Sequence, residues 1–389
     1  MPATAHRKIT MSNIKIIPVD GIRTFISFCK LPRVIYREME GFAPSLDVER
    51  WTLYSHRLNP HFKQVEAQEF LAEINGKYVG RVEAHVYKPE INPVGVSRHQ
   101  FGSLDAIDDI NVVSALMSTA EDWLRGRGAS TIYGPFSPSI NGECGVLVDG
   151  FRATPMIFMP WHPPYISRHL AELDYVKAKD LISYRYDAEN QDLAQKPRIS
   201  TRKEWASRIK VRPLDFSNLK TKETQLLTDL FNEAWGGNWG FVPFTKSEFD
   251  STADALKLIM PREYGFVVEL DGSPVSFAIA LPNIYEITTD LDGKLFPTGL
   301  FKLLSRIRNH KFKSARMVML GTKKKLQNSA TGGVVLLTIV EELRARAQRI
   351  STTHLEAGWI LEDNMSMRKP IEMFGAKIDK VHRIYEKRI

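Results

Sequence analysis

The sequence contains very little cysteine: only Cys29 and Cys144 occur among its 389 residues. Neither lies in a Cys-x-x-Cys pair or at ligand spacing from a histidine. Two thiols are too few for a disulfide framework, and no zinc motif is present. We therefore expect a reduced, cytoplasmic protein that needs no metal.

Long hydrophobic runs are also missing. The longest apolar stretch, Val334–Val340, is far shorter than the roughly 20 residues that a membrane-spanning helix requires. The N-terminal part carries Asp20 and Arg23 and has no apolar core next to a cleavage site, which argues against a signal peptide. The remaining choice is between the cytoplasm and peripheral contact with the inner face of the membrane.

Charge is abundant and unbalanced. There are 53 Lys and Arg against 45 Asp and Glu, which gives a net charge of +8. A basic surface attracts phosphorylated cofactors, nucleic acid or anionic membrane, and it also simply keeps a protein soluble. The 43% hydrophobic and 25% charged residues indicate a globular chain, and its length favours two domains.

The chain contains an internal repeat. Alternating apolar and polar residues surround Asn75-Gly76 and, 196 positions later, Asp271-Gly272, and both dipeptides favour tight β-hairpins. An amphipathic helix (112–127 and 334–349), a short strand (130–134 and 352–359), a second helix and a closing strand follow each hairpin. Two α/β domains follow from this order, with a parallel strand pair around each long helix. We place the first domain at 1–187, the linker at 188–210 and the second domain at 211–389.

The second domain contains a candidate anion site. Residues 315–320 predict a strand, and 321–333 (GTKKKLQNSATGG) form a loop that leads into the long helix. Free amides and the positive end of the helix dipole suit a pyrophosphate, and three lysines at 323–325 add positive charge. The glycine spacing matches neither a P-loop nor a dinucleotide fingerprint.

Two short motifs carry a family resemblance. Gln327-x-x-Ala330-x-Gly332 resembles the Gln/Arg-x-x-Gly-x-Gly/Ala signature of the GCN5-related N-acetyltransferase (GNAT) superfamily. Asn364-x-x-Met367 followed by Gly375 is similar to its Asn-x-x-Ala…Gly-Phe motif. The implied fold is two tandem GNAT domains, each a mixed, mostly antiparallel twisted sheet flanked by helices.

Longer segments resemble a bacterial group of tandem GNAT proteins, some of which are implicated in sphingolipid synthesis as ceramide synthases. These segments are 238–243 (NWGFVP), 134–151 (GPFSPSINGECGVLVDGF) and 163–165 (PPY). The resemblance implies acyl transfer from acyl-coenzyme A to an amine, without metal. The coenzyme-binding positions that it implies are Leu320, Gln327, Asn328, Ser329, Ala330, Thr331, Gly332, Gly333 and Asn364.

The catalytic groups are less clearly marked. Family members often carry a tyrosine seven residues after the asparagine, where this chain has Ile371, so Tyr285, Tyr385 or solvent must protonate the leaving thiolate. Glu356, on the strand before the closing helix, is the first candidate for the general base, with a salt bridge as its structural alternative. His354 and then Glu286 are the next candidates.

The first domain lacks a comparable anion loop, because Asp105, Asp108 and Asp109 would repel a pyrophosphate. The apolar insertion 134–165 is expected to cover the catalytic cleft of the other domain or to form a core between the domains. Candidate acceptor-binding residues, each with core packing as the alternative, are Trp239, Phe241, Tyr285 and Tyr165.

Several functions remain open. The leading interpretation is an acyl-CoA-dependent N-acyltransferase acting on an amine, with the long-chain amine of ceramide synthesis as one candidate acceptor and with no role for nucleic acid. The alternatives are acetylation of a small amine, a Fem-like aminoacyl-tRNA transferase, and a non-catalytic acyl-CoA-binding regulator.

Overall fold

The computed structural model describes residues 13–187, 203–215, 222–257 and 260–389, and all structural statements refer to these ranges. Most of the predicted linker, 188–202, lies outside them. Its remaining part forms a short helix, α5 (Lys203–Ala206), and the start of strand β10 (Ile209–Pro213). No helix in the described ranges combines the length and the apolar character needed to cross a membrane.

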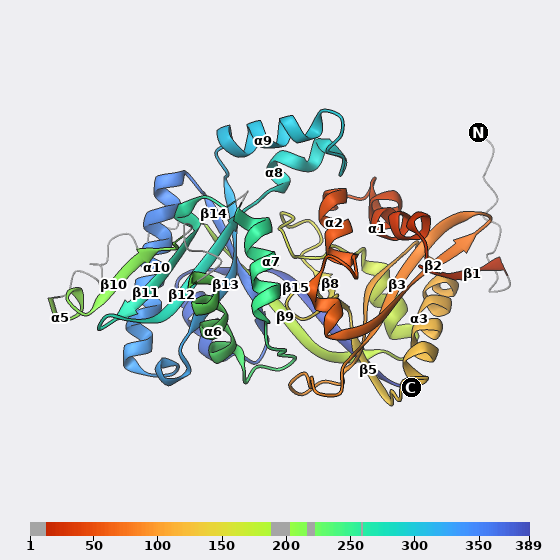
Figure 1. Cartoon of the computed structure of the whole chain (residues 1–389), viewed down its shortest axis with the longest axis horizontal. Helices are drawn as coiled ribbons and strands as arrows, with labels where there is room; N and C mark the ends of the chain where they lie inside the picture. The colour runs from red at the N-terminus through yellow and green to blue at the C-terminus, as the bar shows by residue number, and fades with distance from the viewer. Residues whose placement is uncertain (1–12, 188–202, 216–221, 258–259) are drawn as a thin grey trace.

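The first half begins with a strand and two helices that precede a three-stranded antiparallel meander (Figure 1). A long helix, short strands of the apolar insertion, a further helix and a closing strand follow. The elements are β1 (Lys15–Pro18), α1 (Ile22–Tyr36), α2 (Asp47–Tyr54), η2 (Pro60–Lys63), β2 (Val65–Ile74), β3 (Lys77–Tyr87), β4 (His99–Ala106), α3 (Ile110–Arg125), β5 (Thr131–Gly134), β6 (Phe136–Ser137), β7 (Glu143–Cys144), β8 (Val146–Asp149), α4 (Pro164–Glu172) and β9 (Val176–Asp187).

The second half repeats this order with an added helical arm between its hairpin and the next strand. Its remaining elements are α6 (Thr224–Trp235), α7 (Lys246–Lys257), η6 (Arg262–Tyr264), β11 (Gly265–Leu270), β12 (Ser273–Pro282), α8 (Tyr285–Thr288), η7 (Thr289–Leu291), α9 (Gly299–Asn309), β13 (Ser314–Thr322), η8 (Lys324–Leu326), α10 (Ala330–Ile350), β14 (His354–Leu361), α11 (Met365–Met373) and β15 (Lys377–Arg388).

Both hairpins have the predicted turns. Asn75 and Gly76 have φ of 51° and 76°, and Asp271 and Gly272 have φ of 52° and 78°. Two consecutive left-handed residues match the right-handed twist of the flanking strands, which is why Asn-Gly and Asp-Gly specify this turn. The predicted parallel pairs are also present: β4 pairs with β5 around α3, and β13 pairs with β14 around α10.

The closing strands of the two halves are exchanged. The sheet order is β5-β15-β9-β14, so β15 from the end of the chain pairs with β5 of the first half. Strand β9 from the first half pairs with β14 of the second, and β9 and β15 pair with each other. One mostly antiparallel sheet therefore runs through the molecule, and neither half completes its sheet without the other.

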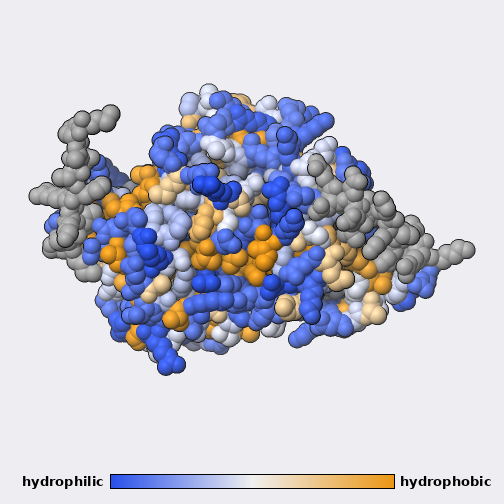
Figure 2. Space-filling model, turned by 180° about the vertical axis from the view of Figure 1, so that it is seen from behind, coloured by the Kyte–Doolittle hydropathy of each residue, from blue (hydrophilic) through white to orange (hydrophobic). Residues whose placement is uncertain are grey.

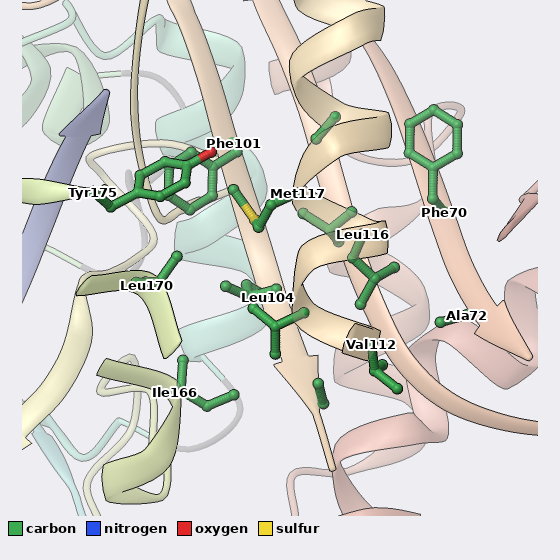
Figure 3. Close-up of a cluster of buried hydrophobic side chains, with 14 of the residues drawn as sticks. Phe70, Ala72, Phe101, Leu104, Val112, Leu116, Met117, Ile166, Leu170 and Tyr175 are labelled. Atoms are coloured by element: carbon green, nitrogen blue, oxygen red, sulfur yellow. The ribbon is translucent and has the colours of Figure 1, made fainter. Parts of the chain in front are cut away.

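The core of the first half shows how the repeat is normally packed. Helix α3 begins at its cap Asp109, whose side chain accepts a hydrogen bond from the Asn111 amide. Its apolar face, which includes Val112, Leu116 and Met117, packs on the sheet (Figure 3). Figure 2 shows the molecule from behind the view of Figure 1. Apolar side chains gather near the middle of this face, and hydrophilic surface surrounds them.

Candidate active site

The candidate site begins where two parallel strands diverge. Strands β13 and β14 pair from Ser314–His354 to Met317–Ala357, where the ladder ends. Strand β13 has a bulge at this point, because its register with β12 shifts between Met317 and Met319. The strands then separate, which leaves backbone groups of β13 without a partner strand on one side.

The start of α10 lies next to this divergence and is open to solvent. Ser329 caps the helix by accepting a hydrogen bond from the Gly332 amide at 3.0 Å. Within the described ranges, no acceptor contacts the amides of Ala330 and Thr331. Ala330, Lys324 and Lys325 are exposed and Thr331 is half-buried, so that solvent can reach this helix start as an anion site requires.

The residues around this helix start have different tasks. A Cβ atom on Gly332 would lie 1.9 Å from the Leu326 carbonyl oxygen, so the turn admits only glycine, whereas Gly333 has open space around it. The Gln327 side chain donates to the carbonyls of Ala234 and Thr322 and thus fixes the loop. Asn364 caps α11 by accepting from the Met367 amide.

Trp235, at the end of α6, reaches into the space between the diverging strands. Its Nε1 donates to the Leu320 carbonyl at 2.9 Å, and its ring packs edge-on against Trp359 of β14 with centroids 6.0 Å apart. Leu320 is a position that we expected to bind the acyl donor, and its carbonyl therefore already accepts a hydrogen bond from within the protein. If the chain of the acyl donor lies along β13, it has to share or displace this hydrogen bond.

Glu356 lies in a buried cluster of charges. Its side chain is 1% exposed and accepts a hydrogen bond from Lys380 Nζ at 2.5 Å, while Arg316 Nε lies 4.0 Å from its other oxygen. Lys380 also donates to Asp379 at 2.6 Å. The salt bridge that we considered as the structural alternative is thus formed, and the general-base role of Glu356 stays a prediction.

His354 is less constrained than Glu356. Its Nε2 has no hydrogen-bond partner among the described residues. Burial, followed by the positive charge of Arg185, lowers the pKa of His354, so the imidazole is neutral at neutral pH and able to accept a proton. Glu286, the third candidate, instead accepts hydrogen bonds from Ser314 and His310 at the edge of the sheet.

Tyr385 and Tyr165 lie in the core of the first half rather than beside β14. The Tyr385 hydroxyl is 2.7 Å from Ser167 Oγ, and the Tyr165 hydroxyl donates to the Ala106 carbonyl at 2.8 Å. The structure therefore does not bring these two tyrosines together with the other predicted site residues.

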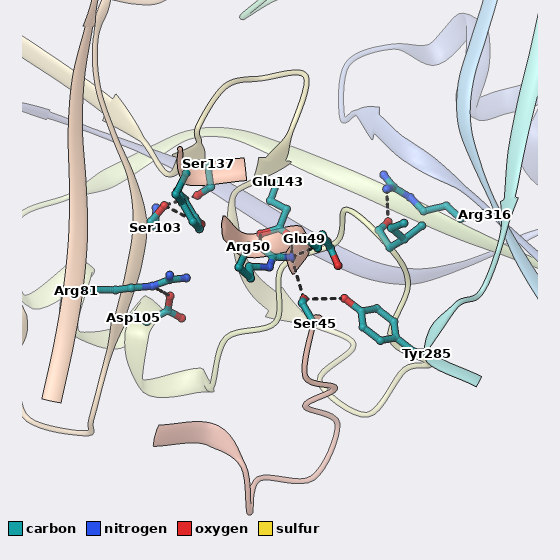
Figure 4. A network of polar contacts seen from close by, with 12 residues as sticks. Ser45, Glu49, Arg50, Arg81, Ser103, Asp105, Ser137, Glu143, Tyr285 and Arg316 are labelled. Atoms are coloured by element: carbon teal, nitrogen blue, oxygen red, sulfur yellow. Dashed lines mark hydrogen bonds and ion pairs between the residues drawn. The ribbon is translucent and has the colours of Figure 1, made fainter. Parts of the chain in front are cut away.

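Tyr285 lies at a polar network that joins the two halves (Figure 4). Its hydroxyl is 3.1 Å from Ser45 Oγ, which also accepts from Arg50, and Arg50 forms a two-pronged ion pair with Glu143 of the insertion. Burial raises the pKa of Tyr285, so its phenol stays protonated and can donate. Sequence reasoning missed Arg50 and Glu143, because their pairing depends on a contact between distant segments.

Trp239 and Phe241, two of the candidate acceptor-binding residues, mainly contribute to packing within the protein. Phe241 belongs to a buried cluster with Phe231, and Trp239 contacts Tyr133 and lies beneath the Lys179 ammonium. Nowhere in the described ranges do three His, Cys, Asp or Glu side chains gather as metal ligands would.

The insertion covers the face of the second half on which Glu356 lies. Ile157 packs with Leu281 and Ile284 of the second half, and Arg316 of β13 donates to the Ile157 carbonyl at 2.6 Å. In the first half, the carboxylate of Asp109 already caps the start of α3, so that helix end offers no free positive pole to an anion.

Comparisons with known proteins agree with this architecture. A tandem GNAT protein from the clavulanic acid biosynthesis pathway covers 96% of this chain and 98% of its own, with a TM-score of 0.57 at 11% identity. The fold is therefore that of a tandem GNAT protein. A scan against models of protein families gives no match.

Two relatives define the family more narrowly. The chain is 36% identical over 371 residues to protein YghO of Escherichia coli (strain K12), covering 95% of this chain and 93% of that protein. It is 35% identical over 379 residues to the bacterial ceramide synthase of Caulobacter vibrioides (strain NA1000 / CB15N), covering 97% and 98%. The chain belongs to the family of these two proteins.

Proposed function

We propose that the chain is an acyl-CoA-dependent N-acyltransferase whose acceptor is a long-chain primary amine of the sphingoid class. The observation that carries the proposal is the open start of α10 beside the diverging strands β13 and β14. The relative named bacterial ceramide synthase supports the acyl-transfer chemistry and the lipid acceptor.

The helix start supplies the donor site in this proposal. The amides of Ala330 and Thr331 bind the diphosphate of the coenzyme, and Lys324 and Lys325 offset its charge. The part of the coenzyme that carries the thioester then lies along β13, past Leu320. No metal takes part, because the thioester is already activated toward an amine.

The chemical step is a direct aminolysis. The neutral amine nitrogen attacks the thioester carbonyl, a C–N bond forms and the C–S bond breaks. His354, or Glu356 if Lys380 releases it, first takes one proton from the substrate ammonium, and after the attack the nitrogen loses a second proton to solvent as the amide forms. An amide of β13 near the bulge stabilises the oxyanion, and Tyr285 or water protonates the departing thiolate.

We place the amine acceptor on the face of the sheet opposite to α10. There Ser45, Tyr285 and Glu143 offer hydrogen-bonding groups between the two halves. A lipid acceptor requires that the protein meet a membrane surface, and the net charge of +8 favours an anionic one.

The experiment is thiol release by the purified protein. Palmitoyl-CoA or acetyl-CoA is mixed with sphinganine, with a small polyamine or with no amine, and free thiol and the amide product are followed. We expect amine-dependent release with palmitoyl-CoA and sphinganine. Release only with acetyl-CoA and the small amine identifies the acetyltransferase alternative, and coenzyme binding without release on any acceptor identifies the regulator.

The tRNA-dependent alternative is tested separately. A Fem-like enzyme would retain tRNA at physiological salt, whereas binding through net charge alone falls steeply as salt rises. We expect no retention at physiological ionic strength.

A further inference from the structure

An apolar groove runs beneath helix α10. It has a cavity volume of about 130 Å³ and lies between α10, α11 and strands β13, β14 and β9. On α10 it is lined by one face of the helix, from Leu336 through Leu343 to Ile350. The fourteen helical steps between Leu336 and Ile350 correspond to about 21 Å, more than the roughly 15 Å that one leaflet's acyl chains cover.

The internal repeat shows that this groove is unusual. Helix α3, the counterpart of α10 in the first half, buries seven of its 16 residues against the sheet. Helix α10 has 21 residues but buries only Val335, Thr338 and Ile339. The sheet beneath it carries small side chains, Ala315 and Ala357, which leave the space unfilled.

The groove is continuous with the proposed donor site. Met317 and Ala357, the last pair of the β13–β14 ladder, both line it, and so does Leu320. At the other end, the hydroxyl of Tyr264 is 3.2 Å from Thr352 Oγ1. A linear apolar chain attached at the strand divergence therefore has a path toward the far end of α10.

We propose that this groove binds the hydrocarbon tail of the acyl donor, so that the enzyme prefers long-chain acyl-CoA. This inference rests on the proposed function. The unliganded cavity is close to the size of an engineered cavity of about 150 Å³ that admits benzene, so a complete tail requires the groove to widen. Helix α11 contributes Met367 and Ile371 to the wall and has no buried residue, which makes it the element that can yield.

The test is binding of a coenzyme series by calorimetry: CoA, octanoyl-CoA and palmitoyl-CoA. Burial of each added methylene tightens binding by up to about fourfold. The graded variants Ala347→Val, Ala347→Leu and Ala347→Phe fill the groove from α10. We expect palmitoyl-CoA to lose at least tenfold in affinity with the largest side chain while CoA binding is unchanged.

Ala345→Phe is the matched control, because Ala345 lies on the same helix but does not line the groove. Chain-length dependence that survives all three Ala347 variants would overturn the tail site. If no coenzyme binds at all, the proposed function fails. The groove is then tested alone with a fluorescent C16 fatty acid, whose binding must be lost in Ala347→Phe and kept in Ala345→Phe.

A second inference comes from the helical arm that stands out above the sheet (Figure 1). Residues 293–313, which include α9, contain six Lys and Arg and no Asp or Glu. Phe296, Phe301 and Leu304 are 80%, 74% and 43% exposed. Large apolar side chains exposed among basic ones are typical of helices that lie in a membrane interface.

The arm is fixed to the first half. Arg33 of α1 donates to the Asp292 carbonyl, and the Asp47 amide of α2 donates to the Gly293 carbonyl. We infer that residues 293–313 form a docking surface for an anionic bilayer. An acidic protein partner would be attracted by the same charges, but the exposed phenylalanines favour the lipid interface.

The test is co-sedimentation of the full chain with vesicles of phosphatidylcholine alone or mixed equally with phosphatidylglycerol. We expect binding to the mixed vesicles, a loss of about fivefold for each of Lys302→Gln and Lys311→Gln, and a larger loss in Phe296→Ser/Phe301→Ser. Met373→Ser removes an equally exposed apolar side chain elsewhere and should change nothing. No binding to mixed vesicles, or equal binding by the phenylalanine variant, would contradict the inference.

Discussion

At the scale of the residue, the buried charges around Glu356 offer the sharpest test. Glu356→Gln leaves the buried Arg316 without a carboxylate nearby and leaves Lys380 with Asp379 as its remaining carboxylate partner. We expect this change to lower the free energy of unfolding by about 3–5 kcal/mol. Denaturant unfolding measures it, and Glu356→Gln/Lys380→Met should recover part of the loss.

The same variants separate structure from catalysis. If Glu356 serves only the ion pair, the double variant regains turnover together with stability. If it is the base, turnover stays low in the double variant although the protein is again stable. Glu356 could be found from the sequence because strand alternation puts it on an inner face, but Lys380 could not, since its side chain reaches Glu356 across β9.

A second residue-scale prediction concerns pH. His382 is buried, its Nε2 donates to the Pro160 carbonyl at 2.8 Å, and burial lowers its pKa to about 3. Between about pH 3 and about pH 6.5, the His382 imidazole binds a proton in the unfolded state but not in the folded state. The free energy of unfolding should therefore fall by a few kcal/mol as the pH drops from about 6.5 toward 3.

Unfolding free energies of His382→Gln across this range provide the check. The variant should show a flatter decline, because glutamine does not titrate. His56 makes a contrasting control: its pairing with Glu69 raises its pKa, so its contribution is lost as the pH rises. An unchanged slope in His382→Gln would assign the acid lability to other groups, such as His162.

At the scale of the element, the start of α10 distinguishes two adjacent glycines. Gly333 has room for a side chain and Gly332 has none. Gly333→Asp puts a carboxylate beside the proposed diphosphate, whereas Gly333→Asn has the same shape without charge. We expect the aspartate variant to raise the KM for acyl-CoA at least tenfold, the asparagine variant to raise it little, and stability to be kept, since acidic residues suit helix starts.

Steady-state kinetics with thermal unfolding measure both effects. Equal KM values for the two variants would remove the anion site from the start of α10. Gly332→Ala provides the opposite contrast, because its methyl group meets the Leu326 carbonyl and should destabilise the turn itself.

Elements with local signals could be predicted well. The Asn-Gly and Asp-Gly turns and the periodic helices depend on neighbours in sequence, and the structure has them within a few residues of the predicted bounds. Helix α11 was less predictable. Pro370 has no amide hydrogen to donate within the helix, and yet the helix runs for nine residues through this position. It lies on the surface, where water can bond the carbonyl that the proline leaves free.

At the scale of the whole molecule, the exchanged strands decide how the chain folds. Residues 1–195 contain β5 without its partner β15, and 196–389 contain β14 without β9. We expect each fragment to be insoluble or unfolded alone and the two to form a soluble complex when co-expressed. Pull-down and circular dichroism measure this, and independent folding of either fragment would contradict it.

Pairing of this kind could not be predicted from the sequence. The repeat indicates five elements in each half, but β9 and β15 are both alternating strands that fit either sheet. Their choice depends on the packing of the whole molecule, and so does the polar network of Arg50, Glu143 and Tyr285.

The position of β15 has a consequence for synthesis in the cell. Because β15 pairs with β5 but comes far later in the sequence, the N-terminal half leaves the ribosome with the edge of β5 unpaired until β15 has been synthesised. Every nascent chain thus passes through a stage in which chaperones can bind this edge, and a product that lacks β15 leaves β5 without its partner.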